Sequence, residues 1–304
     1  MKHARPTPLA IILALVCFVV AFAAAGDRKF EKKFTVAPGE TFTLNTDVGS
    51  IAIVGTAANE VAIEAQIRGR GRDVDEFEII ANQVEKGVEV KGRGRSSGWW
   101  FWNTNDLEVR FTVRVPREYN IRLNTSGGDV GIATIKGRVQ GETSGGNIDV
   151  KDVEGEVDMG TSGGNIRSEK ITGNVRMETS GGDIVLTTIN GDVEAGTSGG
   201  NIRISDVDGK VRAETSGGDV MVRVKNGNKG VYAETSGGDI EIMMDKNIAA
   251  TIDASTSGGE VSCDLPITMS GRIDESRIRG SVNGGGNPIH AHTSGGDVRI
   301  KAAN

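Results

Sequence analysis

A six-residue motif dominates this chain of 304 residues: TSGG, then Asp, Asn or Glu, then Ile or Val. It occurs nine times, and the first six copies are spaced by 18 residues. The copies begin at Thr125, Thr143, Thr161, Thr179, Thr197, Thr215, Thr235, Thr256 and Thr293. Short units at a constant interval form stacked coils, in which each coil covers the hydrophobic face of the next. This period constrains the architecture more than any single residue does.

The apolar residues also keep fixed places within the repeat. With the motif Thr as position 1, position 6 is Ile or Val in every copy, and position 8 is apolar in all copies except at Ser168. Positions 6 and 8 lie on one face of a strand, because side chains alternate along it. Positions 11 and 15 are Ile or Val in the five regular repeats, and mostly charged residues or Thr lie between. Each coil is therefore predicted to contain two short strands with one buried face.

Identical residues at the same repeat position favour parallel, in-register stacking. We therefore predict an all-β fold, a parallel β-solenoid of 18-residue coils with a β-rich N-terminal cap region, right-handed by the usual crossover rule. An antiparallel meander built from nine-residue halves is the alternative. Glycine recurs at positions 3 and 4, and at position 13 in the regular repeats. It predicts turns that need a positive φ or a close approach of two backbones.

Four segments are expected along the chain. Residues 1–25 combine a basic start with an apolar run that ends in small residues, as in a secretory signal peptide. An uncleaved membrane anchor is the alternative, whereas the residue before Cys17 does not suit lipid attachment. Residues 28–124 are expected to form the cap region, 125–263 the regular solenoid, and 264–304 an irregular coil and the last repeat. Cleavage would leave Cys263 unpaired, at a buried apolar position.

Position 5 forms a polar row along the predicted stack. It consists of Asp129, Asn147, Asn165, Asp183, Asn201, Asp219, Asp239, Glu260 and Asp297. We interpret these side chains as turn caps that bond nearby backbone N–H groups. Calcium coordination is the alternative, but the second half of a calcium-binding nonapeptide is missing. The Thr-Ser pair is expected to satisfy turn backbone in the same way rather than to supply a nucleophile.

One aromatic cluster breaks the repeat pattern. Trp99, Trp100, Phe101 and Trp102 include every Trp of the chain, and Arg93 and Arg95 precede them in a Gly-rich loop. Four consecutive aromatic residues cannot all face one core. We therefore predict a partner-binding loop, because Trp is enriched at recognition surfaces. A hydrophobic lid over the first coil is the alternative.

Composition and charge exclude several classes of function. The formal net charge is −6, which argues against a nucleic-acid partner. The carboxylates are spread evenly, so they do not form the paired acid and base of a glycosidase. His290 and His292 are close in sequence, but two ligands without a third make a weak metal site. The sequence therefore predicts no catalytic residues, no metal and no cofactor.

The recurring TSGGDI and TSGGNI units, the lead-in VRVPREYNIRLNTSGGDV and the closing VNGGGNPIHAHTSGGDVRI resemble a known family. It is a bacterial family of adhesin-like proteins of unknown function with TSGG[DN]I β-strand repeats, related to GIN-type autotransporter adhesin heads. The resemblance covers residues 30–304. It implies an exported β-solenoid with an adhesive or envelope role, and it brings no catalytic residues.

The sequence as a whole predicts an exported, non-enzymatic binding or structural module that is periplasmic, secreted or at the cell surface. It would bind through an exposed face or through the Trp-rich loop. The candidate partners are a glycan, an envelope surface or a membrane protein. Two alternatives remain: an envelope-stress or regulatory component that acts through a membrane partner, and a β-helical polysaccharide-processing enzyme.

Overall fold

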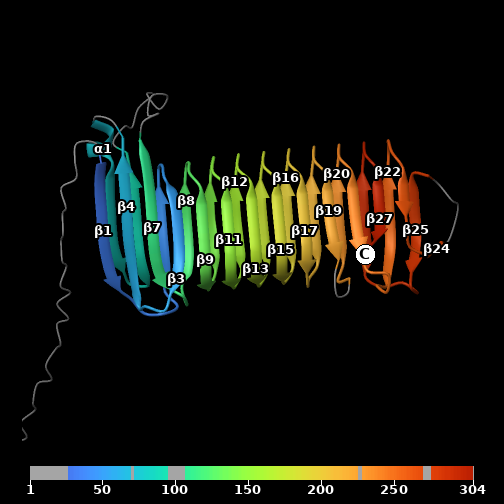
Figure 1. Cartoon of the computed structure of the whole chain (residues 1–304), viewed down its shortest axis with the longest axis horizontal. Helices are drawn as coiled ribbons and strands as arrows, with labels where there is room; N and C mark the ends of the chain where they lie inside the picture. Colours follow the sequence, from blue (N-terminus) through green and yellow to red (C-terminus); the bar gives the residue numbers. More distant parts are fainter. Residues whose placement is uncertain (1–26, 70–71, 95–106, 225–227, 270–274, 304) are drawn as a thin grey trace, which may run out of the picture.

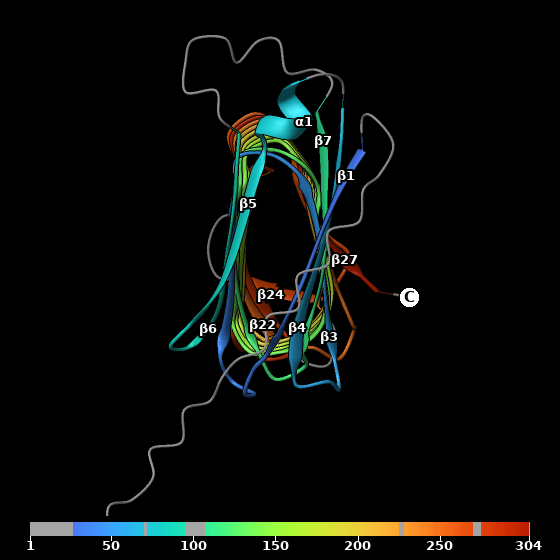
Figure 2. The same cartoon turned by 90° about the vertical axis from the view of Figure 1, so that its left-hand side faces the viewer.

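The computed structural model describes residues 27–69, 72–94, 107–224, 228–269 and 275–303. Two long sheets run side by side along the molecule and face each other across the core (Figures 1 and 2). Sheet A has 13 strands and sheet B has 14. Each regular coil contributes one strand to each sheet, and the strands of successive coils are parallel. The protein is thus an all-β parallel solenoid; its right-handed winding stays a prediction.

The regular stack begins with β8 (Asn120–Thr125) in sheet B and β9 (Val130–Lys136) in sheet A. Sheet A continues with β11 (Ile148–Glu154), β13 (Ile166–Thr172), β15 (Ile184–Asn190), β17 (Ile202–Val207), β19 (Val220–Val224) and β21 (Ile240–Met244). Sheet B continues with β10 (Val139–Thr143), β12 (Val157–Thr161), β14 (Val175–Thr179), β16 (Val193–Thr197), β18 (Val211–Thr215) and β20 (Val231–Thr235).

The core consists of the predicted apolar rows. Ile166 pairs with Ile148 on one side and with Ile184 on the other, and all three are at most 1% exposed. This parallel register rules out the antiparallel meander. Ser168, the exception in the position-8 row, is buried between Val150 and Leu186, and its hydroxyl has no hydrogen-bond partner.

A stacked bulge explains why the buried positions run 6, 8 and 11. Position 10 has a positive φ in five successive coils, at Thr134, Asp152, Lys170, Thr188 and Asp206. The pairing of β11 with β13 skips this position, so the next residue turns inward. The sequence did not reveal the bulge, because none of these five residues is a glycine.

Two of the three glycine positions have a steric reason. At position 4, a Cβ on Gly182 would lie 2.0 Å from the carbonyl oxygen of Gly164 in the preceding coil. At position 13, Gly173 has a φ of 143° and a similarly close neighbour. At position 3, the nearest atom to a Cβ on Gly181 is 3.6 Å away. The expectation of close backbone approach holds for positions 4 and 13 only.

The N-terminal end departs from sequence order. From the regular stack outward come β2 (Thr41–Thr46) with β3 (Ser50–Thr56), and then β6 (Gly87–Arg93) with β7 (Glu108–Pro116). Antiparallel strands lie outside them: β4 (Glu60–Arg68), β1 (Asp27–Thr35) and β5 (Glu78–Val84), with α1 (Arg72–Glu76) just before β5. Lys32 of β1 reaches the carbonyl oxygen of Ala81 on the edge strand β5.

The C-terminal end departs from sequence order in the same way. The last two strands, β26 (Pro288–Thr293) and β27 (Val298–Ala302), lie between the β20–β21 coil and the coil of β22 (Ala250–Thr256) and β23 (Val261–Cys263). A hairpin of β24 (Ile267–Met269) and β25 (Arg277–Val282) pairs antiparallel with β22. Because β23 is the last strand of sheet A, Cys263 is only half-buried, contrary to expectation. Its partial burial raises the pKa of its thiol.

Candidate functional site

The interior of the solenoid is committed to packing, so functional side chains must come from the outward positions or from the turns. The predicted Trp-rich loop, Trp99 to Trp102 with Arg95, lies outside the described residues. Arg93, the sixth residue predicted to act there, is the last residue of β6. The neighbouring Gly92 pairs with Thr46, which in turn pairs with Thr125. The β6 end of the loop is therefore anchored at the edge of the solenoid that carries the TSGG turns.

The position-5 row forms a continuous hydrogen-bonded ladder at that edge. The Oδ1 atom of Asp183 accepts the backbone N–H of Asn201 in the next coil, at 2.7 Å. The same bond recurs at 2.7–2.9 Å along Asp129, Asn147, Asn165, Asp183, Asn201, Asp219, Asp239, Asp297 and Glu260. Each of these side chains except that of Glu260 thus bonds the backbone of the next coil in the stack rather than its own turn.

The motif threonines form a second, buried ladder. The hydroxyl of Thr179 donates to the carbonyl oxygen of Gly164 at 2.9 Å and accepts the N–H of Gly182 at 3.3 Å. The motif serines lie beside them at exposed positions, as at Ser180. Both hydrogen-bonding roles of these threonines are therefore used for structure. They are poorly placed to act as nucleophiles.

A groove with an apolar lining runs across the outer face of sheet B. It has a volume of about 750 Å³ and crosses the coils from β12 to β26. Residues of positions 14, 15 and 16 line it, but the position-15 valines face the core and are at most 5% exposed, so its accessible side chains come mainly from positions 14 and 16. We call it the valine groove; its valines are Val157, Val175, Val193, Val211 and Val231.

The walls of the valine groove carry mixed charge. Position 16 supplies Arg176, Glu194 and Arg212, and position 14 supplies Asn174, Asp192 and Lys210. Arg176 forms an ion pair with Glu194 at 2.8 Å, and the neighbouring carboxylates raise its pKa. Such a lining offers hydrogen-bond donors and acceptors at every coil.

An aromatic and cationic stack closes one end of the valine groove. The rings of Tyr232 and His290 are 4.9 Å apart and inclined by 15°, and the Arg212 guanidinium lies 4.4 Å from the centre of the Tyr232 ring. Both faces of Tyr232 are therefore covered, and a ligand can reach only the edge of its ring. Arg212, Tyr232 and His290 each lie three residues before a motif Thr. This shared repeat position is the signal that could have predicted their stacking from the sequence.

A second groove runs beside the TSGG turns. It has a volume of about 460 Å³, and its lining includes Glu142, Gly160, Glu178, Gly196 and Glu214 at position 18. Glutamate and glycine thus alternate, and the exposed serines of position 2 form the other wall. Arg176 and Arg212 bond Glu178 and Glu214, respectively, so two of the three acids are already paired.

His290 and His292, which were weighed above as metal ligands, belong to the inserted strand β26. His290 stacks on Tyr232, and His292 Nδ1 lies 3.0 Å from the Ser255 hydroxyl. Within the described part of the chain, no group of three or more His, Cys, Asp or Glu side chains could hold a metal ion. The same residues contain no helix long and apolar enough to cross a membrane.

The solved structures that match most of the chain share little of its sequence. A putative adhesin from Bacteroides fragilis is 13% identical, with a TM-score of 0.42 over 91% of this chain and 97% of that one. A putative lipid binding protein from Parabacteroides distasonis is 15% identical, with a TM-score of 0.42 and the same coverage. A putative cell adhesion protein from Clostridium sporogenes is 14% identical, with a TM-score of 0.27 over 91% and 100%.

No curated protein matches the chain. A family profile, described as Toastrack DUF4097, matches residues 40–301. That range runs from just before β2 into β27, so it includes the regular stack and both out-of-order ends except for β1. The chain therefore belongs to the Toastrack DUF4097 family.

Proposed function

We propose that this protein is an exported, non-enzymatic, adhesin-like module of the cell envelope that holds an extended glycan along the outer face of sheet B. The observation that carries the proposal is the valine groove, which crosses successive coils without interruption. Two of the solved neighbours are named as adhesion proteins and one as a lipid binding protein, so their names do not favour a glycan over a lipid.

The chemistry of the groove favours a glycan over a peptide. Backbone groups in the middle of sheet B are bonded to neighbouring strands, so a peptide could not add to its face as a further strand. A sugar ring offers apolar C–H faces for Pro288, the edge of Tyr232 and the apolar stems of the Lys and Arg side chains, and hydroxyls for their charged groups. The coils repeat at about 4.8 Å, so an extended polymer would meet similar contacts at each coil.

The described side chains argue for binding rather than turnover. A glycosidase needs two carboxylates that face each other across the bond to be cleaved. In the valine groove, Glu194 is bonded to Arg176, and Glu156 is bonded to Arg138. Asp192 accepts the backbone N–H of Lys210. These acids serve the scaffold, and none is placed as half of such a pair.

Charge reversal on the two outer faces tests the proposed surface. Lys210→Glu combined with Arg212→Glu changes the wall of the valine groove, and Arg203→Glu combined with Arg223→Glu makes the same change on exposed positions of sheet A. We expect the first pair alone to abolish retention on immobilised envelope polysaccharide. Because Arg212→Glu also removes the Glu214 ion pair and the contact with Tyr232, that protein should melt at a somewhat lower temperature but still be folded at the temperature of the assay. Equal retention by both variants would disprove the location of the site.

The Trp-rich loop is proposed as a second contact point. Replacing Trp99, Trp100 and Trp102 with Ala should leave the melting temperature near that of the wild type and reduce binding to cells or envelope fractions. A clear fall in melting temperature with unchanged binding would instead support a lid over the end of the solenoid. Export is tested separately: N-terminal sequencing of protein from the envelope should begin after residue 25.

A further inference from the structure

The last coil of the chain occupies an interior position in the stack. Its strands β26 and β27 lie between two coils that precede them in the sequence. Ile289 pairs with Val231 on one side and with Ile252 on the other. A segment of five residues, 283–287, joins this coil to β25. The fixed 18-residue period of the regular stack does not by itself require this order.

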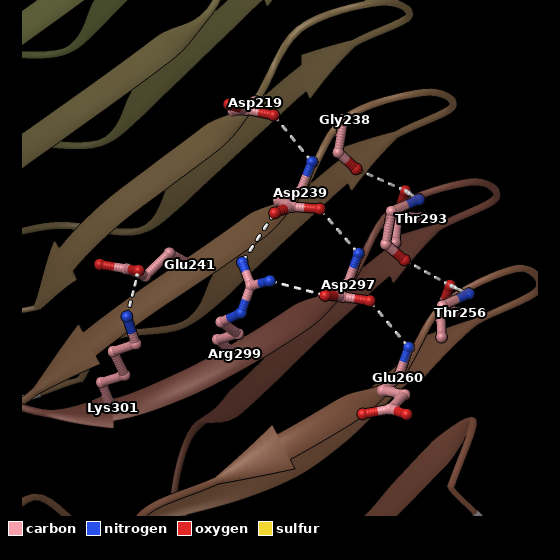
Figure 3. A network of polar contacts seen from close by, with 12 residues as sticks. Asp219, Gly238, Asp239, Glu241, Thr256, Glu260, Thr293, Asp297, Arg299 and Lys301 are labelled. Carbon is pink, nitrogen blue, oxygen red and sulfur yellow. Dashed lines mark hydrogen bonds and ion pairs between the residues drawn. The ribbon is translucent and has the colours of Figure 1, made fainter.

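Charged residues select the inserted order over the sequential one. Arg299 bonds Asp239 at 2.7 Å and Asp297 at 2.6 Å, and Lys301 bonds Glu241 at 2.7 Å (Figure 3). If β23 stacked directly on β21 instead, Glu260 would lie beside Asp239, and Ser262 would replace Arg299. The inserted order also places Asp297 beside Asp239 and Glu260 beside Asp297, but Arg299 offsets these carboxylates, whereas the sequential order would leave Asp239 and Glu260 adjacent without that cation. A direct contact between β21 and β23, which would close the empty slot, is therefore unfavourable. A coil inserted between these strands is favoured instead.

The remaining bonds across the slot are those of any TSGG coil. Asp297 continues the position-5 ladder from Asp239 to Glu260, and Thr293 and Thr256 continue the threonine ladder (Figure 3). The slot thus recognises a coil of this sequence, and nothing in these contacts requires that the coil come from the same molecule.

The connection to the last coil is short and tightly wound. Asn283, Gly284 and Gly285 have φ values of 51°, 84° and 87°, so three consecutive residues are in the left-handed region. The side chain of Asn283 is held by the carbonyl oxygens of Lys246 and Ile248. The two glycines adopt this conformation without strain, so only Asn283 would gain from an extended hinge. A short hinge of this kind favours exchange between molecules.

We propose that two copies of this chain exchange their C-terminal coils, β26 and β27, each filling the slot of the other. Exchange keeps every contact of the slot and changes only the hinge, which is the general basis of domain swapping. A dimer formed in this way would carry two valine grooves on one particle. Any ligand with repeated sites would then be bound with greater avidity.

Single cysteines placed on different molecules test the exchange. Met243 and Lys301 are paired on adjacent strands of sheet A. In a background with Cys17→Ala and Cys263→Ala, one full-length protein carries Met243→Cys and another carries Lys301→Cys. Refolded together and oxidised, they should give a covalent dimer. A single protein with both substitutions should give an internal disulfide, which shows that the geometry permits the bond.

The control for random collision replaces the second protein with one carrying Arg203→Cys, an exposed position on the same sheet. A dimer yield from Met243→Cys and Lys301→Cys no greater than this control would overturn the proposal. Deleting Gly284 and Gly285 gives a second measurement, because the shortened hinge can no longer return the coil to its own slot. We expect a stable dimer in light scattering; a folded monomer with a docked last coil would also overturn the proposal.

Discussion

The regular stack and the two ends of the solenoid obey different rules. In the middle, coils follow one another in sequence order, and each residue packs on the equivalent residue of the next coil. At both ends the order is broken: an earlier or later coil lies between the stack and the outermost coil. The comparison shows that a coil selects its neighbours only by the type of residue at each repeat position. Any coil with the same residue types at these positions can therefore fill a place in the stack.

The two ends also differ from each other. The N-terminal end is filled by the largest buried side chains of the described residues, among them Phe42, Phe77, Phe111 and Tyr119. Burial, followed by the negative charge of Glu40, raises the pKa of Tyr119. The C-terminal end is closed by a short hairpin and by ion pairs, such as Arg277 and Arg279 with Asp253. Aromatic packing closes one end of the solenoid, and charge pairing contributes to closing the other.

The largest expected effect is a difference in stability between a substitution in the middle of the regular stack and one at the C-terminal end of the solenoid. Ile184→Asp places an unpaired charge in the centre of the buried ladder and should cost about 3–5 kcal/mol of unfolding free energy. Val261→Asp makes the same kind of change in the last strand of sheet A, where Val261 is 9% exposed and has a neighbouring strand on one side only, and should cost less, about 2 kcal/mol. Asp183→Asn is the control and should cost little, because Asn serves at the same position in Asn165 and Asn201.

Denaturant unfolding of these three proteins measures the ranking. If Val261→Asp proved as damaging as Ile184→Asp, the end coil would be as tightly packed as the middle, and the contrast between the two regions would fail. If Asp183→Asn were the worst of the three, the assignment of the inner and outer faces would be wrong.

Glycine substitutions give a second, slightly smaller contrast within one coil. Gly182→Ala would place its Cβ 2.0 Å from the Gly164 oxygen, so successive coils must move apart at a cost of about 2–4 kcal/mol. Gly181→Ala has its nearest neighbour at 3.6 Å and should change stability by less than about 0.5 kcal/mol. Thermal melts of the two proteins check this, and similar melting temperatures would contradict the close spacing of the coils at position 4.

Ser168→Val should stabilise the regular stack. The Ser168 hydroxyl is buried without a partner, and valine completes the apolar row between Val150 and Leu186. We expect a gain of about 1–2 kcal/mol, from the lost desolvation penalty and the added apolar contact. Ser180→Val, at an exposed motif serine, is the matched control. A loss of stability from Ser168→Val would indicate that the hydroxyl has a partner, such as a buried water.

The smallest effect concerns acid and the C-terminal end. The backbone N–H of Asp297, followed by the Arg299 guanidinium, lowers the pKa of Asp239. A carboxylate with a lowered folded-state pKa stabilises the native state fully above its unfolded value, about 3.9, and loses that contribution as the pH falls through the folded value. The melting difference between the wild type and Asp239→Asn should therefore shrink on acidification. A difference that grew in acid would contradict the assigned pairing.

Much of this structure follows from the spacing of residues. The constant interval and the rows at positions 6, 8, 11 and 15 predicted parallel, in-register coils, because only that arrangement stacks like on like. The threonine row was expected to serve the backbone, and Thr179 does so. The bulge at position 10 was missed, since Thr188 or Lys170 carries no mark of a positive φ.

The sequence by itself determined the repeating unit of this protein, because the contacts within the stack are between residues at one repeat position. Only the tertiary structure decided which coil lies beside which at the two ends. Tyr232 meets His290, and Ser255 meets His292, only because the last coil enters between its predecessors. Identical rows make several coil orders compatible with the same ladders. The choice among them rests on a few charged residues, such as Arg299, whose partners are known only once the chain is folded.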